Sequence, residues 1–193
     1  MELYCEEKKY DYLCNILILG NEFVGKSAFI EKYKNKNNYK KFLESQKKYF
    51  PTIGCDVMLM KIKYLNKKFK LQVWDTSGQE TFFNIIKAYL KTPNVILIFY
   101  DALNRISFNK AKTYYQEYIS VNADVMAIFI RSKYELKGKN ILDIVSDEEV
   151  LEFIDNKPNS FFFHLSCFEK YETGINNLIE FIIIQIIKNK LNL

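Results

Sequence analysis

The chain has 193 residues, a mass of 23.0 kDa and a formal net charge of +5, which suits one domain with a core that needs no disulfide or structural metal. Its four cysteines form no C-x-x-C pair, so free thiols in a reducing, intracellular compartment are expected. Nucleic-acid binding is not indicated, and the longest apolar stretch, residues 179–187, is too short to span a bilayer.

A strand, a glycine-rich loop and a helix follow one another near the N-terminus. Residues 13–19 form an apolar run typical of a buried strand, the next eight read G-N-E-F-V-G-K-S, and a helical pattern begins at Ala28. Backbone N–H groups of such a loop surround a triphosphate, so Lys26 would reach the β- and γ-phosphates and the Ser27 hydroxyl would ligate Mg²⁺. The predicted phosphate-binding residues of this loop are Gly20, Glu22, Phe23, Val24, Gly25, Lys26 and Ser27.

The next segments predict a helix and a hairpin. Residues 28–33 open the helix, and the polar stretch 34–48, rich in lysine and asparagine, is expected to be loop or frayed helix. Residues 55–65 and 69–75 then read as two strands of a hairpin that turns at residues 66–68.

The second half of the chain alternates strands with helices. Ser146 and Glu149 form a capping box that opens one of these helices. Such alternation predicts an α/β sheet covered on both faces, with ligands at the C-terminal ends of the strands. The expected strands are 95–101, 125–130 and 161–165, and the expected helices are 108–119, 146–154 and 176–190.

Two further motifs carry groups that suit a metal-bound triphosphate. In W-D-T-S-G-Q-E, Asp75 can hold Mg²⁺ through water, Gly78 lets a backbone N–H approach a γ-phosphate, and Gln79 could orient an attacking water. In Y-F-P-T-I-G, Thr52 can add a hydroxyl ligand to the same metal. Either motif alone could be a plain turn.

Together these segments resemble the Ras-like small GTPases, and the Rab branch most closely. The resemblance rests on K-L-Q-V-W-D-T-S-G-Q-E, P-T-I-G-C-D and F-Y-D-A-L-N-R-I-S-F and extends over residues 13–187. It implies an α/β P-loop NTPase G domain with a six-stranded, mostly parallel sheet and helices on both faces. We expect this domain at 13–190, with an N-terminal extension at 1–12 and a C-terminal end at 191–193.

The resemblance also implies a function. It predicts a Mg²⁺-dependent switch that binds GTP and GDP, with Ser27 and Thr52 as metal ligands, Asp75 in the second sphere and Gln79 as the catalytic residue. Loss of the γ-phosphate would release the loops of Thr52 and Gly78 together. Effector, exchange and activating proteins would read these switch segments. A cytoplasmic monomer in vesicle traffic is expected, reaching endomembranes through partners.

The base-binding segments depart from the family pattern. The family's Asn-Lys-x-Asp motif is replaced by Ser132, Lys133, Tyr134 and Glu135, and Glu135 is one methylene longer than the aspartate that pairs with guanine. The loop that usually reads Ser-Ala-Lys is here Ser166-Cys167-Phe168. We expect guanine preference with reduced affinity or discrimination. Sequence drift explains these changes as well, if phosphate and Mg²⁺ contacts supply the nucleotide affinity.

Two other departures concern the phosphate loop and the first switch. Glu22 and Phe23 stand where the family has small residues, so the charge and bulk predict slow hydrolysis without a helper. Additional residues in 34–48 would enlarge the first switch or extend the preceding helix. They form either a partner surface or a tolerated insertion.

The remaining predictions concern lipid anchoring, the lysine runs, His164 and alternative functions. No C-terminal prenylation motif is present, so direct lipid anchoring is doubtful, and the lysine runs are a solvated surface or a weak site for acidic membranes or partners. His164 is expected to be structural. The alternative function is a non-hydrolysing G domain that serves as an interaction module. A small-metabolite kinase is disfavoured, because Gln79 and Thr52 have no place in its chemistry.

Overall fold

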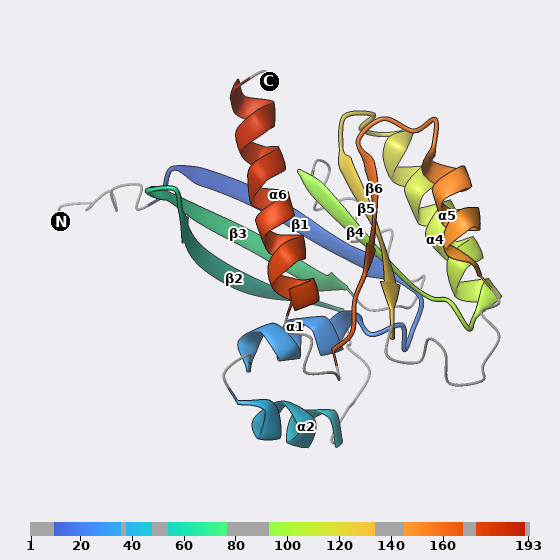
Figure 1. Ribbon diagram of the computed structural model, residues 1–193, viewed down its shortest axis with the longest axis horizontal. Helices are drawn as coiled ribbons and strands as arrows, with labels where there is room; N and C mark the ends of the chain where they lie inside the picture. The colour runs from blue at the N-terminus through green and yellow to red at the C-terminus, as the bar shows by residue number, and fades with distance from the viewer. Residues whose placement is uncertain are drawn as a thin grey trace.

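Six strands form one sheet in the order β2-β3-β1-β4-β5-β6 (Figure 1). The structure, a computed structural model, describes residues 10–35, 38–47, 54–76, 93–133, 145–167 and 173–191. The strands are β1 (Tyr12–Gly20), β2 (Cys55–Tyr64), β3 (Lys67–Thr76), β4 (Val95–Asp101), β5 (Met126–Ser132) and β6 (Ser160–His164). Only β2, which is antiparallel to β3, departs from the parallel arrangement of this sheet.

Helices cover both faces of the sheet, as the sequence predicts. They are α1 (Lys26–Lys34), α2 (Tyr39–Lys47), α4 (Arg105–Ile119), α5 (Asp147–Ile154) and α6 (Thr173–Leu191). Successive side chains of a strand point to opposite faces, so Ile16 and Ile18 of β1 pack into one core with α1 and α6. Leu17 and Leu19 pack into the other core, with α4 and α5. The fold is the predicted α/β G domain.

Local capping signals set the starts of two helices. The Ser146 hydroxyl accepts a hydrogen bond from the Glu149 amide at 3.2 Å, which confirms the predicted start of α5. The Asn104 side chain accepts from the Ser107 amide at 3.2 Å, so α4 begins at Arg105 rather than at the predicted residue 108. An N-cap asparagine therefore decided the boundary that hydrophobic periodicity had placed too late.

The polar stretch after α1 contains a separate helix. Because α1 ends at Lys34, the predicted alternative that the additional residues extend it is wrong. The loop alternative is also wrong for Tyr39–Lys47, which is α2. Asn38 accepts from the Lys41 amide at 3.0 Å and Phe42 is fully buried, so a cap and one apolar anchor stabilise this helix.

The hairpin turns one residue earlier than the sequence predicts. Tyr64 pairs with Lys67, which leaves Leu65 and Asn66 as a two-residue loop, with φ angles of 46° and 60°. Two positive φ angles give the twist that matches paired strands. The predicted turn at residues 66–68 is therefore wrong, and Lys67 and Lys68 belong to β3.

None of the helices in the described part of the chain is both long and apolar enough to cross a lipid bilayer.

Candidate functional site

The predicted phosphate loop follows the C-terminal end of β1 and leads into α1. Gly20 is the last residue of β1 and its Cα pairs with Phe99 of β4. With φ of 144°, a Cβ added at Gly20 would lie 2.4 Å from the Phe99 carbonyl oxygen, so the close approach of β4 requires glycine. Gly25, with φ of 97°, then caps α1 without any side-chain hydrogen bond. The first turn of α1 therefore receives no capping group from Gly25.

Lys26 is held inside this loop. Only 6% of the residue is exposed, and its Nζ donates to the carbonyl oxygens of Gly20 at 2.9 Å and Asn21 at 2.8 Å. Burial lowers the pKa of the ammonium from 10.5 to about 8, while the charges of Asp75 and Glu22 act in the opposite direction. The loop thus carries a desolvated cation that neighbouring carboxylates keep protonated.

Asp75 lies at the C-terminal end of β3, beside β1. It pairs with Ile18 in the sheet, is 5% exposed, and its Oδ1 has no hydrogen-bond partner among the described residues. Burial raises the pKa of its carboxyl, while a hydrogen bond with Ser27 and the charge of Lys26 lower it. A buried carboxylate oxygen left unpaired beside a hydroxyl fits Mg²⁺, which is usually bound by few protein oxygens and several waters.

The described half of the Asn-Lys-x-Asp region lies at the end of β5. The Ser132 hydroxyl donates to the Tyr100 carbonyl oxygen at 2.9 Å, so its donor serves the sheet. Lys133 has φ of 56° and its Nζ donates to Asp101 Oδ2 at 2.6 Å. Sequence reasoning missed Asp101, although its place at the end of a predicted strand, like that of Asp75, was a usable signal.

An ion-pair cluster joins the ends of β5 and β6. Asp147, the first residue of α5, accepts from Arg131 Nη1 at 2.5 Å and contacts His164 Nε2 at 2.9 Å. The Leu165 amide also donates to the Arg131 carbonyl oxygen at 2.9 Å. His164 is therefore part of a structural network that sequence reasoning did not find.

The remaining predicted residues divide into two groups. Glu22 and Phe23 are exposed, Val24 is buried, and Ser166 and Cys167 are buried just after β6. The others lie outside the described residues, so their roles stay predictions; these are Thr52, Gly78, Gln79, Glu135 and Phe168. The described site residues all lie at the C-terminal ends of strands or in the segments that directly follow them, as the sequence predicts.

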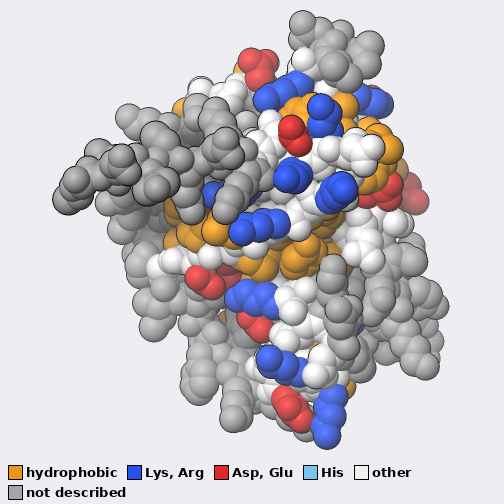
Figure 2. Space-filling view, turned by 90° about the vertical axis from the view of Figure 1, so that its left-hand side faces the viewer, with side chains coloured by type: hydrophobic (Ala, Val, Ile, Leu, Met, Phe, Trp, Pro, Cys, Tyr) orange, Lys and Arg blue, Asp and Glu red, His pale blue; other side chains and the backbone are white. Residues whose placement is uncertain are grey.

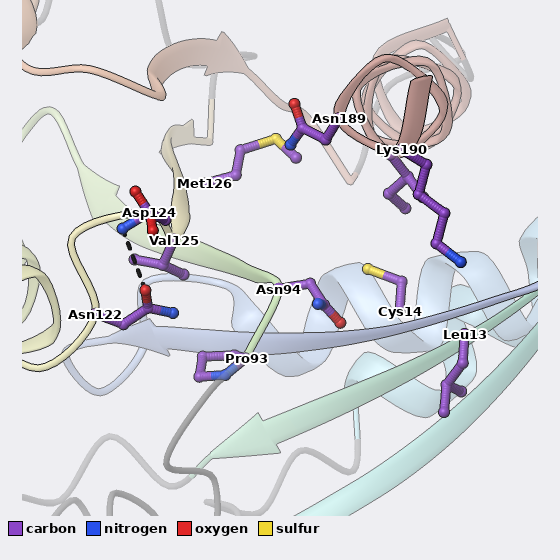
Figure 3. Close-up of a pocket in the computed structure, with 11 residues that line it drawn as sticks. Leu13, Cys14, Pro93, Asn94, Asn122, Asp124, Val125, Met126, Asn189 and Lys190 are labelled. Carbon is purple, nitrogen blue, oxygen red and sulfur yellow. Dashed lines mark hydrogen bonds between the residues drawn. The ribbon is translucent and has the colours of Figure 1, made fainter. Parts of the chain in front are cut away.

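A cavity of about 330 Å³ lies at the opposite ends of the strands (Figure 3). Cys14, Asn94 and Met126, near the starts of β1, β4 and β5, line it together with Asn189 and Lys190 of α6. Burial raises the pKa of the Cys14 thiol to about 12, so this thiol is not a nucleophile at neutral pH. None of the predicted site residues lines this cavity.

Comparison with known proteins gives the family. The model of the Ras family matches residues 15–188. Ras-related protein Rab-11B of Dictyostelium discoideum is 32% identical over 185 residues, which is 94% of this chain and 79% of that protein. GTP-binding protein YPT1 of Saccharomyces cerevisiae is 33% identical over 136 residues, 70% of this chain and 63% of that protein. The chain therefore belongs to the Ras family of small GTPases, as a divergent, Rab-like member.

Proposed function

We propose that the protein is a Mg²⁺-dependent switch that binds GTP and GDP and hydrolyses GTP slowly. The observation that carries this proposal is that a buried ammonium, Lys26, and a buried carboxylate, Asp75, lie close enough at the phosphate loop for each charge to act on the other. Both groups are desolvated, so each would gain from a bound triphosphate and its metal ion. Membership of a GTPase family supports the same chemistry.

The proposed phosphate contacts combine the geometry of Lys26 with the predicted roles of residues in the other motifs. On binding, Lys26 Nζ would exchange the carbonyl oxygens of Gly20 and Asn21 for phosphate oxygens. The hydroxyls of Ser27 and Thr52 would ligate Mg²⁺, and Asp75 would hold it through water. When bound, Mg²⁺ neutralises charge on the phosphate oxygens. Thr52 and Gly78 would contact the γ-phosphate, so its loss would release both switch segments to regulators and effectors.

The proposed base contacts are weaker than those of the family. Held by Asp101, the stem of Lys133 would lie along the base, while Glu135 would accept from guanine and Cys167 would offer its backbone N–H. Ser166 and Phe168 would complete this loop. Replacing Glu135 by Asp should tighten GDP binding by about tenfold, while the affinity for inorganic phosphate should not change. An unchanged GDP affinity would show that the base is held by other residues.

Slow hydrolysis is proposed because of two exposed residues of the loop, Glu22 and Phe23. Phe23 is 62% exposed and adopts φ of 60°, and Glu22 lies close enough to act on the charge of Lys26. A carboxylate here opposes the charge of a γ-phosphate, and the ring restricts the space for the water that Gln79 would orient. In single-turnover assays with bound GTP, Glu22→Ala and Phe23→Gly should each raise the rate about tenfold or more. Rates equal to wild type would contradict this explanation.

A role in vesicle traffic is proposed from the similarity to Rab proteins alone. Cytoplasmic protein would be recruited to endomembranes in its GTP form and released in its GDP form. A fluorescent fusion carrying Gln79→Leu should therefore accumulate on membranes, while Lys26→Ala should stay diffuse. The same diffuse distribution for both variants would contradict this role.

A non-hydrolysing interaction module is the second candidate. The hydrogen bond from Ser132 to Tyr100 favours it, because this hydroxyl is used within the sheet rather than offered to a base. It accounts less well for the buried charges of Lys26 and Asp75, which have a cost in a protein that binds no nucleotide. Nucleotide content after purification separates the two candidates.

A further inference from the structure

Five lysines lie on the β2–β3 hairpin, at positions 61, 63, 67, 68 and 70. The strand register places Lys61 opposite Lys70 and Lys63 opposite Lys68. Because side chains alternate along a strand, these four ammonium groups share one face in two facing pairs. Like charges directly opposite each other destabilise paired strands. The hairpin therefore carries a charge arrangement that folding alone does not favour.

No ion pair compensates for this charge among the residues that the structure describes, although Lys70 Nζ lies 5.3 Å from the centroid of the Tyr10 ring. The ion pairs of the described residues involve Lys34, Arg105, Arg131, Lys133 and His164, and none includes a hairpin lysine. Two acidic side chains contact the hairpin near its tip, but neither contacts an ammonium group: Asp11 accepts from the backbone amide of Lys68 at 2.7 Å, and Glu180 of α6 accepts from the Tyr64 hydroxyl at 3.1 Å. The hairpin ammonium groups thus remain available to an external anion.

The tip of the hairpin is apolar. Leu65 is 76% exposed, the most exposed of the large hydrophobic residues described, and its φ of 46° is unfavourable for a bulky side chain. Asn66, with φ of 60°, is the expected residue for such a turn. A leucine is therefore held away from the core, in a conformation that asparagine or glycine would adopt more easily.

The end of α6 adds cations beside the hairpin. Lys190 Nζ lies 4.9 Å from the centroid of the Tyr12 ring, which stacks on Phe69 of β3 at 4.7 Å. Lys188 is exposed on the same last turn. Figure 2 shows this side of the molecule, where lysines border an apolar strip. Figure 1 places the hairpin tip at the far end of the sheet from the phosphate loop that follows β1.

We propose that the tip of the β2–β3 hairpin binds an anionic bilayer surface. Leu65 enters the interface, while Lys61, Lys63, Lys68 and Lys70 contact lipid headgroups. The tip is a protruding turn with cations on both faces of the ribbon, since Lys67 points to the opposite side from the paired lysines. This shape fits a planar anionic surface better than the body of an acidic protein. The nucleotide site then faces away from the bilayer.

Vesicle flotation with the full chain tests this proposal. Vesicles of phosphatidylcholine alone should not bind, and vesicles with about a third phosphatidylserine should bind, with a loss at high salt. The triple change Lys61→Gln, Lys63→Gln and Lys68→Gln should lower the partition coefficient about a hundredfold. Leu65→Asn should lower it about tenfold. Both variants relieve unfavourable features of the hairpin, so their melting temperatures should equal or exceed that of wild type.

A matched charge control uses three lysines on other elements, with Lys40→Gln, Lys41→Gln and Lys110→Gln on α2 and α4. It should reduce vesicle binding far less than the hairpin triple. Equal losses in the two triple variants would show a net-charge effect and would overturn the proposal. Tighter binding to soluble polyglutamate than to the vesicles, unaffected by Leu65→Asn, would overturn it in favour of an acidic protein partner. Nucleotide binding is measured separately, so failure here leaves the proposed switch untouched.

Discussion

Lys26 donates a hydrogen bond across its own loop to the carbonyl oxygen of Gly20, 2.9 Å away. Backbone carbonyl oxygens thus satisfy the ammonium, and a phosphate oxygen would be a stronger acceptor. Because burial already disfavours the charge of Lys26, the bond network and two neighbouring carboxylates set its protonation.

Nucleotide affinity should depend on pH through Lys26. With a pKa of about 8 in the folded protein, the amine is partly neutral above that pH and must take up a proton to bind phosphate. GDP affinity should be constant below pH 8 and fall by up to about tenfold per pH unit above it. Fluorescent GDP titrations up to about pH 9 would detect this. Lys26→Arg stays protonated, so the break should vanish in this variant.

The lowered pKa of Lys26 also makes the free energy of unfolding depend on pH. Between pH 8 and 10.5 the unfolded chain holds more protons on Lys26 than the folded one, so the free energy of unfolding of nucleotide-free protein should rise with pH there. A decrease assigned to this residue, by comparison with Lys26→Met, would contradict the buried position of the amine.

Asp75→Asn should separate metal binding from folding. Removing the carboxylate should weaken the tightening of GDP binding by Mg²⁺ about 10- to 100-fold. Since burial raises the pKa of Asp75, its charge is unfavourable in the empty protein, and the variant should not unfold more easily. Asp56→Asn is the matched control, because Asp56 is the exposed neighbour of Asp75 in the β2–β3 pairing. Equal metal dependence in both variants would exclude the proposed role.

Asp147→Asn should destabilise the protein by about 3 kcal/mol, because it removes a carboxylate that forms an ion pair with the buried guanidinium of Arg131. Glu149→Gln is the comparison, since the side chain of its partner Arg105 is 40% exposed, against 3% for Arg131, and the loss should stay below about 1 kcal/mol. Urea unfolding measures both.

The stabilisation that Asp147 gains from Arg131 and His164 should also depend on pH. Despite the opposing effect of burial, hydrogen bonds from Arg131 and His164 hold the pKa of Asp147 at about 2, below its ordinary value of 3.8. The stabilisation should be fully present above pH 3.8 and be lost as the pH falls towards 2. Wild type and Asp147→Asn should therefore converge in stability in acid, and a constant difference would contradict the assignment.

Leu65→Asn should stabilise the hairpin by about 0.5–1 kcal/mol, because asparagine adopts a positive φ more readily than leucine. The same change at Leu59, which is also exposed but lies within β2, should lower stability. Thermal unfolding of the pair gives the comparison, and stabilisation by both changes would point to a general effect of removing exposed leucines.

The sequence predicted the parts of the fold that local patterns control. The bounds of β4 match because seven consecutive buried residues end at Asp101, and α5 begins where Ser146 caps it. Helix α2 was harder, because its stability depends on burial of Phe42 against α1 in a stretch of low hydrophobicity. The hairpin turn was misplaced because strand twist selects a two-residue loop even when one of its residues is Leu65.

In the candidate site, too, the sequence predicted the residues of local motifs but not the contacts between separate strands and helices. The loop motif predicts Lys26 just after one strand, and the W-D-T-S-G-Q-E motif predicts Asp75 at the C-terminal end of another; the structure has both residues at these places. The bond of Lys133 to Asp101 and the network of Arg131 with Asp147 depend on which strands lie side by side. No spacing along the chain reveals such pairs, since they join residues from separate strands and helices.

Nucleotide binding to the purified protein tests the central claim most directly. Any nucleotide that copurifies is identified, and GTP, GDP and ATP are then titrated with and without Mg²⁺ into wild type and Lys26→Ala. Guanine nucleotides should bind wild type with a roughly submicromolar Kd that Mg²⁺ tightens, ATP should bind more weakly, and Lys26→Ala should lose binding. Absence of binding to wild type, or equal affinity in Lys26→Ala, would contradict the claim that this loop grips a triphosphate.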